Sequence, residues 1–434
     1  MSAIRYDPRA LAAQTLASVV GGKSLRAAFA EVSTRLDDVR DRALLAALLY
    51  EGARWWLRFE VALDGMLERP LRERDGDIRA LLVLGLVQLE ILRMPVHAAV
   101  AATVEAARAL RKPAFAGLVN ALLRSWLRER EMRNTELDRD AVTRTSHPRW
   151  LIDAIAVDWP EQAEAILAAN NVPAPLWLRV NRRRIARADF AAQMAAAGMA
   201  CRVPEAVPDA LVLDSSLDVT SAPGYAQGLF SVQDGAAQQA STLLDLRAGQ
   251  RVLDACAAPG GKSAHILETA DVELTALDSD ARRLPRLREN MRRLGLSAAV
   301  HAGDAADPGG WWDQRPFDRI LIDAPCSATG IIRRQPDVKL HRRAADIPGL
   351  AAAQARLLDA LWPLLARGGR LVYATCSVLV DENARQTEVL LARHSDARPV
   401  APTLPWHVAG TGAQNLPGES DMDGFFYAIV DKGN

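Results

Sequence analysis

Hydrophobic residues in the first 130 positions recur at the spacing of helices. Two sets of leucines lie on one helix face each: Leu44, Leu45, Leu48 and Leu49, and then Leu118, Leu122, Leu123 and Leu127. Few runs alternate as strands do, so the pattern predicts an all-helical domain over residues 1–140. The polar stretch 129–147 is interpreted as a linker or domain edge.

Between residues 141 and 234 the pattern becomes mixed. A helical segment covers about Leu151–Ala169, and Leu176–Val180 alternates like a strand. A helix is expected at Asp189–Ala197 and a strand near Ala210–Leu213. This part of the chain is predicted to hold a linker and a small α/β module.

From residue 235 onward, short apolar runs alternate with segments of helix length. The runs are Arg251–Ala255, Glu273–Leu277, Ala298–His301, Arg319–Ile322, Arg370–Ala374 and Phe425–Val430. Strands separated by helices predict a parallel, doubly wound, Rossmann-like sheet over residues 235–434. Such sheets bind ligands beyond the carboxyl ends of their strands, so chemistry is expected there.

Composition narrows the class of protein. The chain has 53 basic and 53 acidic residues and no net charge, which excludes a globally basic nucleic-acid binder but not local basic patches. Its four cysteines lie 50 or more residues apart, a spacing that is typical of neither a zinc site nor a disulfide framework. The N-terminus lacks an apolar signal core, and the most apolar run, Ala80–Leu92, is too short to span a bilayer. We expect a cytoplasmic protein with no metal and no membrane partner.

The first strand of the predicted sheet leads into the loop DACAAPGGKS (254–263). Its two glycines let the backbone approach a ligand, and the helix that follows favours an anionic group at its N-terminus. Cys256 stands where a Walker loop requires glycine, and no G-x-G-x-x-G motif is present. Asp278 and Asp304 follow the next two strands, where acids can accept from ribose hydroxyls and an adenine amine. Each acid alone could be a helix cap, but together with the loop they indicate a nucleoside-like cofactor.

Cys326 and Cys376 follow the fourth and fifth strands. A lone cysteine there is more often a small buried hydrophobe, but two at neighbouring strand ends can converge on one pocket. A thiolate that adds to carbon 6 of cytosine makes carbon 5 reactive towards a sulfonium methyl group. Asp323 suits a hydrogen bond to the ring nitrogen, and a second thiol can assist product release.

Six segments carry a family resemblance: SVQDGAAQQA (231–240), DACAAPGGKS (254–263), DAPCSATG (323–330), RRQPDVK (333–339), ATCSV (374–378) and MDGFFYA (422–428). With them the chain resembles the bacterial small-subunit ribosomal RNA cytosine-5 methyltransferases of the Sun/Fmu (RsmB) family over essentially its whole length. The resemblance implies that Cys376 attacks the base and Cys326 assists release. It also implies that S-adenosylmethionine is bound by Cys256, Ala257, Ala258, Pro259, Gly260, Gly261, Lys262, Asp278, Asp304 and Asp323.

The same resemblance implies a domain organisation and a substrate. Residues 1–140 would form a NusB-like RNA-binding domain, residues 141–234 a linker and an RRM-like module, and residues 235–434 the methyltransferase domain. The expected substrate is a cytosine of 16S ribosomal RNA, free or in an unassembled small subunit.

Two basic clusters are predicted to contact RNA phosphates, with a solvated surface as the alternative for each. The first is Arg179, Arg182, Arg183, Arg184 and Arg187, and the second is Arg333, Arg334, Lys339, Arg342 and Arg343.

Other functions compete with RNA methylation. A non-catalytic RNA-binding or antitermination factor would be expected to lose a thiol or the glycine loop, and both are intact. A DNA cytosine methyltransferase attacks with the cysteine of its Pro-Cys motif, but here a Thr-Cys cysteine is also present. No long target-recognition insert separates residues 326 and 376. An amino-group methyltransferase would favour Asp-Pro-Pro and an aromatic residue, whereas Asp323 is followed by Ala-Pro-Cys.

Overall fold

The computed structural model describes residues 6–214 and 217–433, and the chain divides into two compact units. The first unit comprises residues 1–172 and 332–344, and the second comprises residues 173–331 and 345–434. The chain therefore leaves the second unit shortly after Cys326, contributes one short segment to the first unit, and returns.

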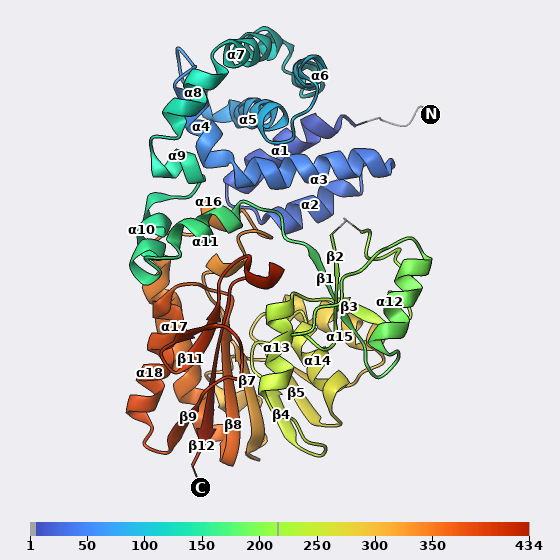
Figure 1. The fold of residues 1–434 in the computed structure, drawn as a ribbon, viewed down its shortest axis with the longest axis vertical. Helices are drawn as coiled ribbons and strands as arrows, with labels where there is room; N and C mark the ends of the chain where they lie inside the picture. Colours follow the sequence, from blue (N-terminus) through green and yellow to red (C-terminus); the bar gives the residue numbers. More distant parts are fainter. Residues whose placement is uncertain (1–5, 215–216, 434) are drawn as a thin grey trace. The chain divides into compact units, whose positions relative to one another are not determined.

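The first unit is built from helices, as the apolar spacing predicts (Figure 1). They are α1 (Pro8–Val20), α2 (Leu25–Ser33), α3 (Val39–Arg54), α4 (Trp56–Asp64), α5 (Gly76–Glu90), α6 (Val96–Ala109), α7 (Ala116–Arg128), α8 (Arg130–Leu137), α9 (Ala141–Thr145), α10 (Arg149–Asp158), α11 (Ala163–Asn170) and α16 (Val338–His341). Helix α5 is apolar on every side and is buried from Ala80 to Leu89. It packs against α1, α3, α4 and α6 and forms the centre of the core.

The polar stretch 129–147, expected to be a linker or domain edge, contains both α8 and α9. Arg58 of α4 is buried and donates to Asp138 Oδ1 at 2.7 Å and to Asn134 Oδ1 at 2.9 Å. It also donates to the carbonyl of Thr143 at 3.2 Å. The polar side chains of this stretch therefore pair with a buried guanidinium, which a hydrophobicity pattern cannot reveal.

The inserted segment 332–344 corrects the second predicted RNA cluster. Lys339 is buried and donates to the carbonyl of Arg54 at 2.7 Å and to Asn171 Oδ1 at 2.8 Å. Burial lowers the pKa of Lys339 well below its usual range. Arg333 is buried as well. Lys339 therefore holds the segment in the helical unit, and both side chains are too buried to contact phosphates.

The second unit contains two sheets. The smaller has the order β2-β1-β3, and its strands are β1 (Leu176–Val180), β2 (Ala210–Leu213) and β3 (Phe230–Val232). Helix α12 (Arg187–Ala196) covers it with Phe190 and Met194. The strands and helix expected for this module are confirmed, while β3 adds a strand that was not expected.

The larger sheet has nine strands among the described residues and carries the expected site. Eight of them have the order β10-β11-β12-β8-β7-β4-β5-β6, and β9 pairs with β12 outside this path. Its strands are β4 (Arg251–Asp254), β5 (Glu273–Asp278), β6 (Ala299–Ala302), β7 (Phe317–Asp323), β8 (Leu365–Thr375), β9 (Ala397–Val400), β10 (His407–Ala409), β11 (Gly412–Asn415) and β12 (Phe425–Lys432). From β6 to β8 the pairing is parallel, as predicted. Beyond β8 it is antiparallel, so the sheet is mixed and not wholly parallel.

Alternate residues of the strands point to opposite faces of this sheet. Val252, Leu321 and Val372 pack with α13 (Gly235–Leu243), α14 (Gly261–Thr269) and α15 (Leu284–Leu294). Leu253 and Ile320 pack on the other face with α17 (Asp346–Leu361), and α18 (Ala384–Arg393) lies beside it (Figure 1). Burial on both faces explains the nearly continuous apolar runs of these strands.

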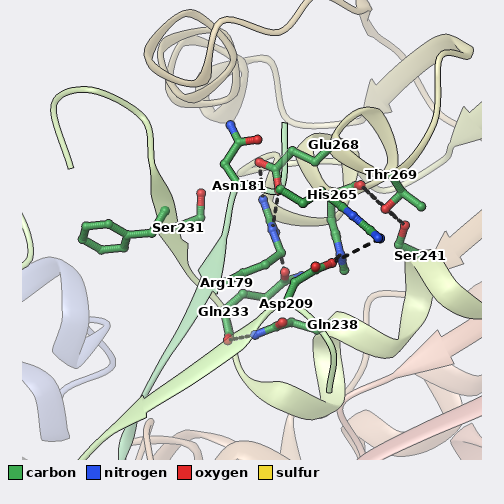
Figure 2. Close-up of polar contacts among 12 residues, drawn as sticks. Arg179, Asn181, Asp209, Ser231, Gln233, Gln238, Ser241, His265, Glu268 and Thr269 are labelled. Atoms are coloured by element: carbon green, nitrogen blue, oxygen red, sulfur yellow. Dashed lines mark hydrogen bonds and ion pairs between the residues drawn. The ribbon is translucent and has the colours of Figure 1, made fainter. Parts of the chain in front are cut away.

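Arg179 of β1 corrects the first predicted RNA cluster, because it is buried in a network of polar side chains (Figure 2). Its guanidinium forms two hydrogen bonds of 2.8 and 3.0 Å with Glu268 of α14. It also donates to Gln233 Oε1 and, at 2.7 Å, to the carbonyl of Gly261, the first residue of α14. The small module thus holds both ends of the helix that follows the glycine loop.

Exposed members of the same cluster also bind protein groups. Arg183 donates to the carbonyl of Glu268 at 3.3 Å and pairs with Asp271 at 2.7 Å. Arg187 donates to the carbonyl of Pro204 at 3.0 Å. Cations near the last turn of a helix stabilise it. These contacts give Arg183 and Arg187 a structural role within the second unit.

We expect the Arg179–Glu268 pair to behave as a buried ion pair and not as an RNA contact. Arg179→Leu should lower the free energy of unfolding by about 3–5 kcal/mol, because Glu268 is left charged and buried. Urea unfolding measures this, and Arg179→Leu combined with Glu268→Leu should recover part of the loss. Arg182→Leu, at an exposed position of the cluster, should change stability by no more than about 0.5 kcal/mol. Full stability with weakened RNA binding in Arg179→Leu would contradict the assignment.

Candidate active site

Acids and a thiol collect at the carboxyl edge of the large sheet. Asp254, Asp278 and Asp323 are the last residues of β4, β5 and β7, and Cys376 follows β8 directly. Because the parallel strands end at one edge, the side chains of Asp278, Asp323 and Cys376 line a common cavity of about 400 Å³. Its lining comprises Ala255, Cys256, Ala258, Asp278, Ser279, Arg283, Asp304, Ala305, Asp323, Ala324, Pro325, Cys326, Ala328, Ala353, Arg356, Leu357 and Cys376.

The structure brings seven of the predicted site residues to this cavity: Cys256, Ala258, Asp278, Asp304, Asp323, Cys326 and Cys376. The other five, Ala257, Pro259, Gly260, Gly261 and Lys262, belong to the loop but do not line the cavity. Gly260 has a φ of +97°, and a Cβ there would lie 3.0 Å from Leu287 Cγ. A residue with a side chain would be strained at this turn, so glycine is required.

Asp278 connects the loop to the second strand. It is nearly fully buried and accepts from the backbone N–H of Ala258 at 2.9 Å and of Asp280 at 3.0 Å. Arg283, at the end of the short helical turn that follows, lies 3.2 Å from its Oδ2. Arg283 was not among the predicted site residues, although its position five residues after Asp278 could have indicated it.

Asp304 lies at the mouth of the cavity and accepts from Arg356 of α17 at 2.9 Å. The backbone N–H of Ala306 and the Arg356 charge hold the pKa of Asp304 below its ordinary value. Arg356 was also missed, since 52 residues separate the pair and no local pattern joins them.

Asp254 lies beneath the cavity and is buried. Its Oδ2 accepts from Ser263 Oγ at 2.6 Å. Burial, with a smaller contribution from the nearby charge of Asp323, raises the pKa of Asp254 to about 7. Burial therefore leaves this carboxyl partly protonated at neutral pH.

The two active-site cysteines lie against each other, with their sulfur atoms 3.4 Å apart and no disulfide between them. The hydrogen bond to Cys326 raises the pKa of the Cys376 thiol well above its usual range, and burial and the negative charge of Asp323 act in the same direction. Lys262 Nζ lies 2.7 Å from Asp323 Oδ2 and opposes this effect in part. Cys376 is therefore a thiol in the free protein.

Cys256 differs from this pair in its surroundings. Burial, followed by the charges of Asp323 and Asp254, raises the pKa of its thiol. Its place is in the wall of the cavity, beside the glycine loop.

Among residues 6–214 and 217–433, no group of three or more His, Cys, Asp or Glu side chains is arranged to hold a metal ion. No helix in that part of the chain is long and apolar enough to cross a membrane.

Three family models match the chain in order. Residues 7–128 match the NusB family, residues 147–220 the ferredoxin-like domain of RsmF/B-like methyltransferases, and residues 241–431 the 16S rRNA methyltransferase RsmB/F model. The ribosomal RNA small subunit methyltransferase B of Xanthomonas campestris is 48% identical over 432 residues, which cover 98% of this chain and 97% of that protein. The chain belongs to the ribosomal RNA small subunit methyltransferase B family. It is an S-adenosylmethionine-dependent ribosomal RNA methyltransferase.

Further relatives agree with this assignment. The methyltransferase B of Vibrio cholerae is 45% identical over 428 residues, covering 98% of this chain and 97% of the relative. Among solved structures, PH0851 is similar in fold with a TM-score of 0.83 and 22% identity, covering 99% of this chain and all of that one. A methyltransferase homologue from Pyrococcus horikoshii has a TM-score of 0.60 and 27% identity over 67% of this chain and 97% of that one.

The cavity suits the chemistry of the cofactor. S-adenosylmethionine carries a positive sulfonium and a ribose, and the cavity is lined by the carboxylates of Asp278, Asp304 and Asp323. Asp278 is buried beside the loop, where a carboxylate can accept from ribose hydroxyls. The helix α14 begins at Gly261, so its N-terminus lies next to the same loop and favours a carboxylate.

We expect the pH dependence of thiol alkylation to report the coupling of the two cysteines. Because the pKa of Cys376 is raised, its alkylation by iodoacetamide should rise by roughly tenfold per pH unit from about pH 7 to about pH 9. Removing the hydrogen bond in Cys326→Ala should shift this rise to lower pH. Mass spectrometry of the labelled peptides measures the rates, with Cys201 as an internal reference outside the cavity. Identical curves for Cys376 in both proteins would contradict the coupling.

Proposed function

We propose that this enzyme methylates carbon 5 of a cytosine in 16S ribosomal RNA through a covalent bond between Cys376 and the base. The observation that carries the proposal is the 3.4 Å separation of the Cys326 and Cys376 sulfur atoms within one acidic cavity. Methylation of an amino group or a ribose hydroxyl needs no thiol. Two thiols suit a reaction in which one adds to the ring and the other helps to end the addition.

Bound S-adenosylmethionine supplies the methyl group as an electrophile on its sulfonium. We assign its binding to residues 256–262 and to Asp278, Asp304 and Asp323. Asp278 would accept from the ribose hydroxyls, and Asp304, at the mouth of the cavity, from the adenine amine. The acidic lining favours a cationic ligand and raises its local concentration.

Cys376 acts first in the proposed reaction. Its sulfur forms a bond to carbon 6 of the cytosine, and the electron pair of the C5–C6 double bond moves towards carbon 5. The Asp323 carboxyl takes the proton of the Cys376 thiol and delivers it to the ring nitrogen N3. Carbon 5, now electron-rich, accepts the methyl group, and the bond between that group and the sulfonium breaks with its electrons left on sulfur.

Cys326 acts after methyl transfer. As a thiolate it removes the proton on carbon 5, and the released electron pair re-forms the C5–C6 double bond and expels Cys376. The N3 proton returns through Asp323 to the expelled Cys376 thiolate as aromaticity returns, and Cys326 then loses the carbon 5 proton to solvent. A base placed 3.4 Å from the leaving sulfur is well placed for this step.

RNA recognition is assigned to the domains that precede the catalytic residues. We infer that residues 1–140 form a NusB-like domain that recognises the RNA, and that residues 141–234 join it to the catalytic residues 235–434. The base must be turned out of any helix to reach the cavity. The substrate is naked 16S RNA or an assembling small subunit in the cytoplasm.

Replacing Asp278 tests the cofactor assignment. Asp278→Ala should weaken S-adenosylmethionine binding by about 1–3 kcal/mol, because buried hydroxyls would lose a charged acceptor. Isothermal titration calorimetry measures the affinity. Asp280→Ala is the control, since Asp280 caps the next turn and does not line the cavity. Equal affinity in wild type and Asp278→Ala would mean that Asp278 only shapes the loop.

Separate replacement of the two cysteines tests the order of their roles. Cys376→Ala should abolish methylation and form no covalent complex with RNA. Cys326→Ala should attack the base, transfer the methyl group and then stall, because nothing removes the carbon 5 proton. The methylated enzyme–RNA complex should accumulate as a slow band on a denaturing gel.

The reverse pattern would assign the nucleophile to Cys326. In that case the complex would accumulate in Cys376→Ala, as in the mechanism of DNA cytosine methyltransferases. Thermal melts of both variants verify that they are folded. Bisulfite sequencing of 16S RNA from a strain that lacks the gene identifies the modified cytosine, and an unchanged pattern would contradict the substrate assignment.

A further inference from the structure

Each active-site cysteine is followed by a serine, and a single buried carboxylate binds both serines. Glu382 Oε1 accepts from the backbone N–H of Ser327 at 2.8 Å. Its Oε2 accepts from the hydroxyl of Ser377 at 2.6 Å. Glu382 is fully buried, at the end of a short 3-10 turn formed by Val380–Glu382.

The bonds around Glu382 connect the two cysteine-bearing turns. Gln354 of α17 donates to Glu382 Oε1 at 3.1 Å and to the carbonyl of Pro325 at 2.9 Å, so the residue before Cys326 is also held. The hydroxyls of Ser327 and Ser377 lie 3.2 Å apart. The backbone N–H of Gly330 donates to the carbonyl of Cys376 at 2.9 Å. Both cysteines therefore project from turns that are bonded together underneath them.

The chemistry of a carboxylate suits this position. Its two oxygens accept in two directions, and the donors that reach it from Ser327, Ser377 and Gln354 are neutral. A buried carboxylate needs such bonds, and losing it would remove an acceptor that all three donors share. A glutamine offers one acceptor oxygen and one donor nitrogen, so it can serve one turn as an acceptor but not both.

We propose that Glu382 is a positioning residue that sets the separation of the Cys326 and Cys376 sulfur atoms. It touches neither sulfur and acts through the two serines. The inference rests on the proposed function only for its catalytic consequence, which is that base release needs both thiols close together. The geometric part concerns the free enzyme.

Thiol oxidation in the absence of RNA tests the geometric part. Diamide, an azo compound, oxidises two nearby thiols to a disulfide and takes up their two protons and two electrons to become a hydrazine. Disulfide formation is sensitive to small changes in geometry, so Glu382→Gln should slow the Cys326–Cys376 reaction by roughly tenfold or more. Asp381→Asn is the matched control, because Asp381 is the neighbouring carboxylate and is exposed, pairing with Arg385. It should react at the wild-type rate.

A second readout follows the catalytic consequence. In single turnover, Glu382→Gln should form the covalent RNA complex but release it more slowly than wild type, while its S-adenosylmethionine affinity stays unchanged. A purely structural role would lower stability without changing the ratio of complex formed to product released.

Two outcomes overturn the proposal: wild-type disulfide formation in a folded Glu382→Gln protein, or equal slowing in Asp381→Asn. If thermal melts show that Glu382→Gln is unfolded, Ser377→Ala replaces it, since this change removes the hydroxyl that donates to Glu382 Oε2 and keeps the carboxylate. Ser377→Ala should slow disulfide formation, and a wild-type rate would reject the proposal. Because the oxidation needs no RNA, a failed cysteine assignment and a failed role of Glu382 give separate results.

Discussion

Asp254, Asp278 and Asp323 end three neighbouring strands of the parallel sheet, and Asp304 follows the next strand. Four carboxyls at one edge repel one another, and the surrounding protein reduces the screening that water would supply. Part of this repulsion is relieved by Arg283, Arg356 and Lys262, which pair with three of the acids. Asp254 forms no such pair in the part of the chain that the structure describes, and burial, with a smaller contribution from the charge of Asp323, raises its pKa to about 7. A cationic cofactor reduces the same repulsion, so the site that is costly when empty is suited to S-adenosylmethionine.

The carboxyl-rich edge of the sheet needs rigid support, and the small α/β module supplies part of that support. Arg179 bonds the carbonyl of Gly261 and the carboxylate of Glu268, which lie at opposite ends of α14. His265 and Asp209 add a second contact at 3.3 Å between the same helix and the module (Figure 2). The burial of His265 lowers its pKa to about 4, so it is neutral at physiological pH and contributes a hydrogen bond instead of a charge. The cofactor loop is thus fixed from outside the methyltransferase sheet.

The sequence predicts those strands and helices that depend on a local pattern of apolar residues. The bounds of β2 agree with the expected Ala210–Leu213, and strands β4, β5 and β7 lie within a few residues of their predicted ranges, because buried strands between loops leave clear apolar runs. Strand β11, with the residues GAQN, has no such run and is buried through its pairing with β12. The cavity could be located because strand ends share an edge. The burial of Arg179 and Lys339 could not be predicted, since Arg179 and Glu268 are 89 residues apart and nothing local shows that Lys339 is buried.

The raised pKa of Cys376 is compatible with its proposed role as a nucleophile. Thiolates derived from thiols of higher pKa are intrinsically more nucleophilic, so the cost of deprotonation is partly offset by reactivity. Addition to cytosine also requires a proton at N3, and a cysteine that enters the reaction as a thiol brings that proton with it. Asp323 accepts from Lys262 and interacts electrostatically with the Cys376 thiol, so in the proposed reaction it accepts the proton from sulfur and passes it to the ring. A thiolate formed in the free enzyme would be reactive without a substrate, 3.4 Å from a second thiol. Keeping Cys376 protonated until the base arrives therefore protects the pair and couples deprotonation to substrate binding.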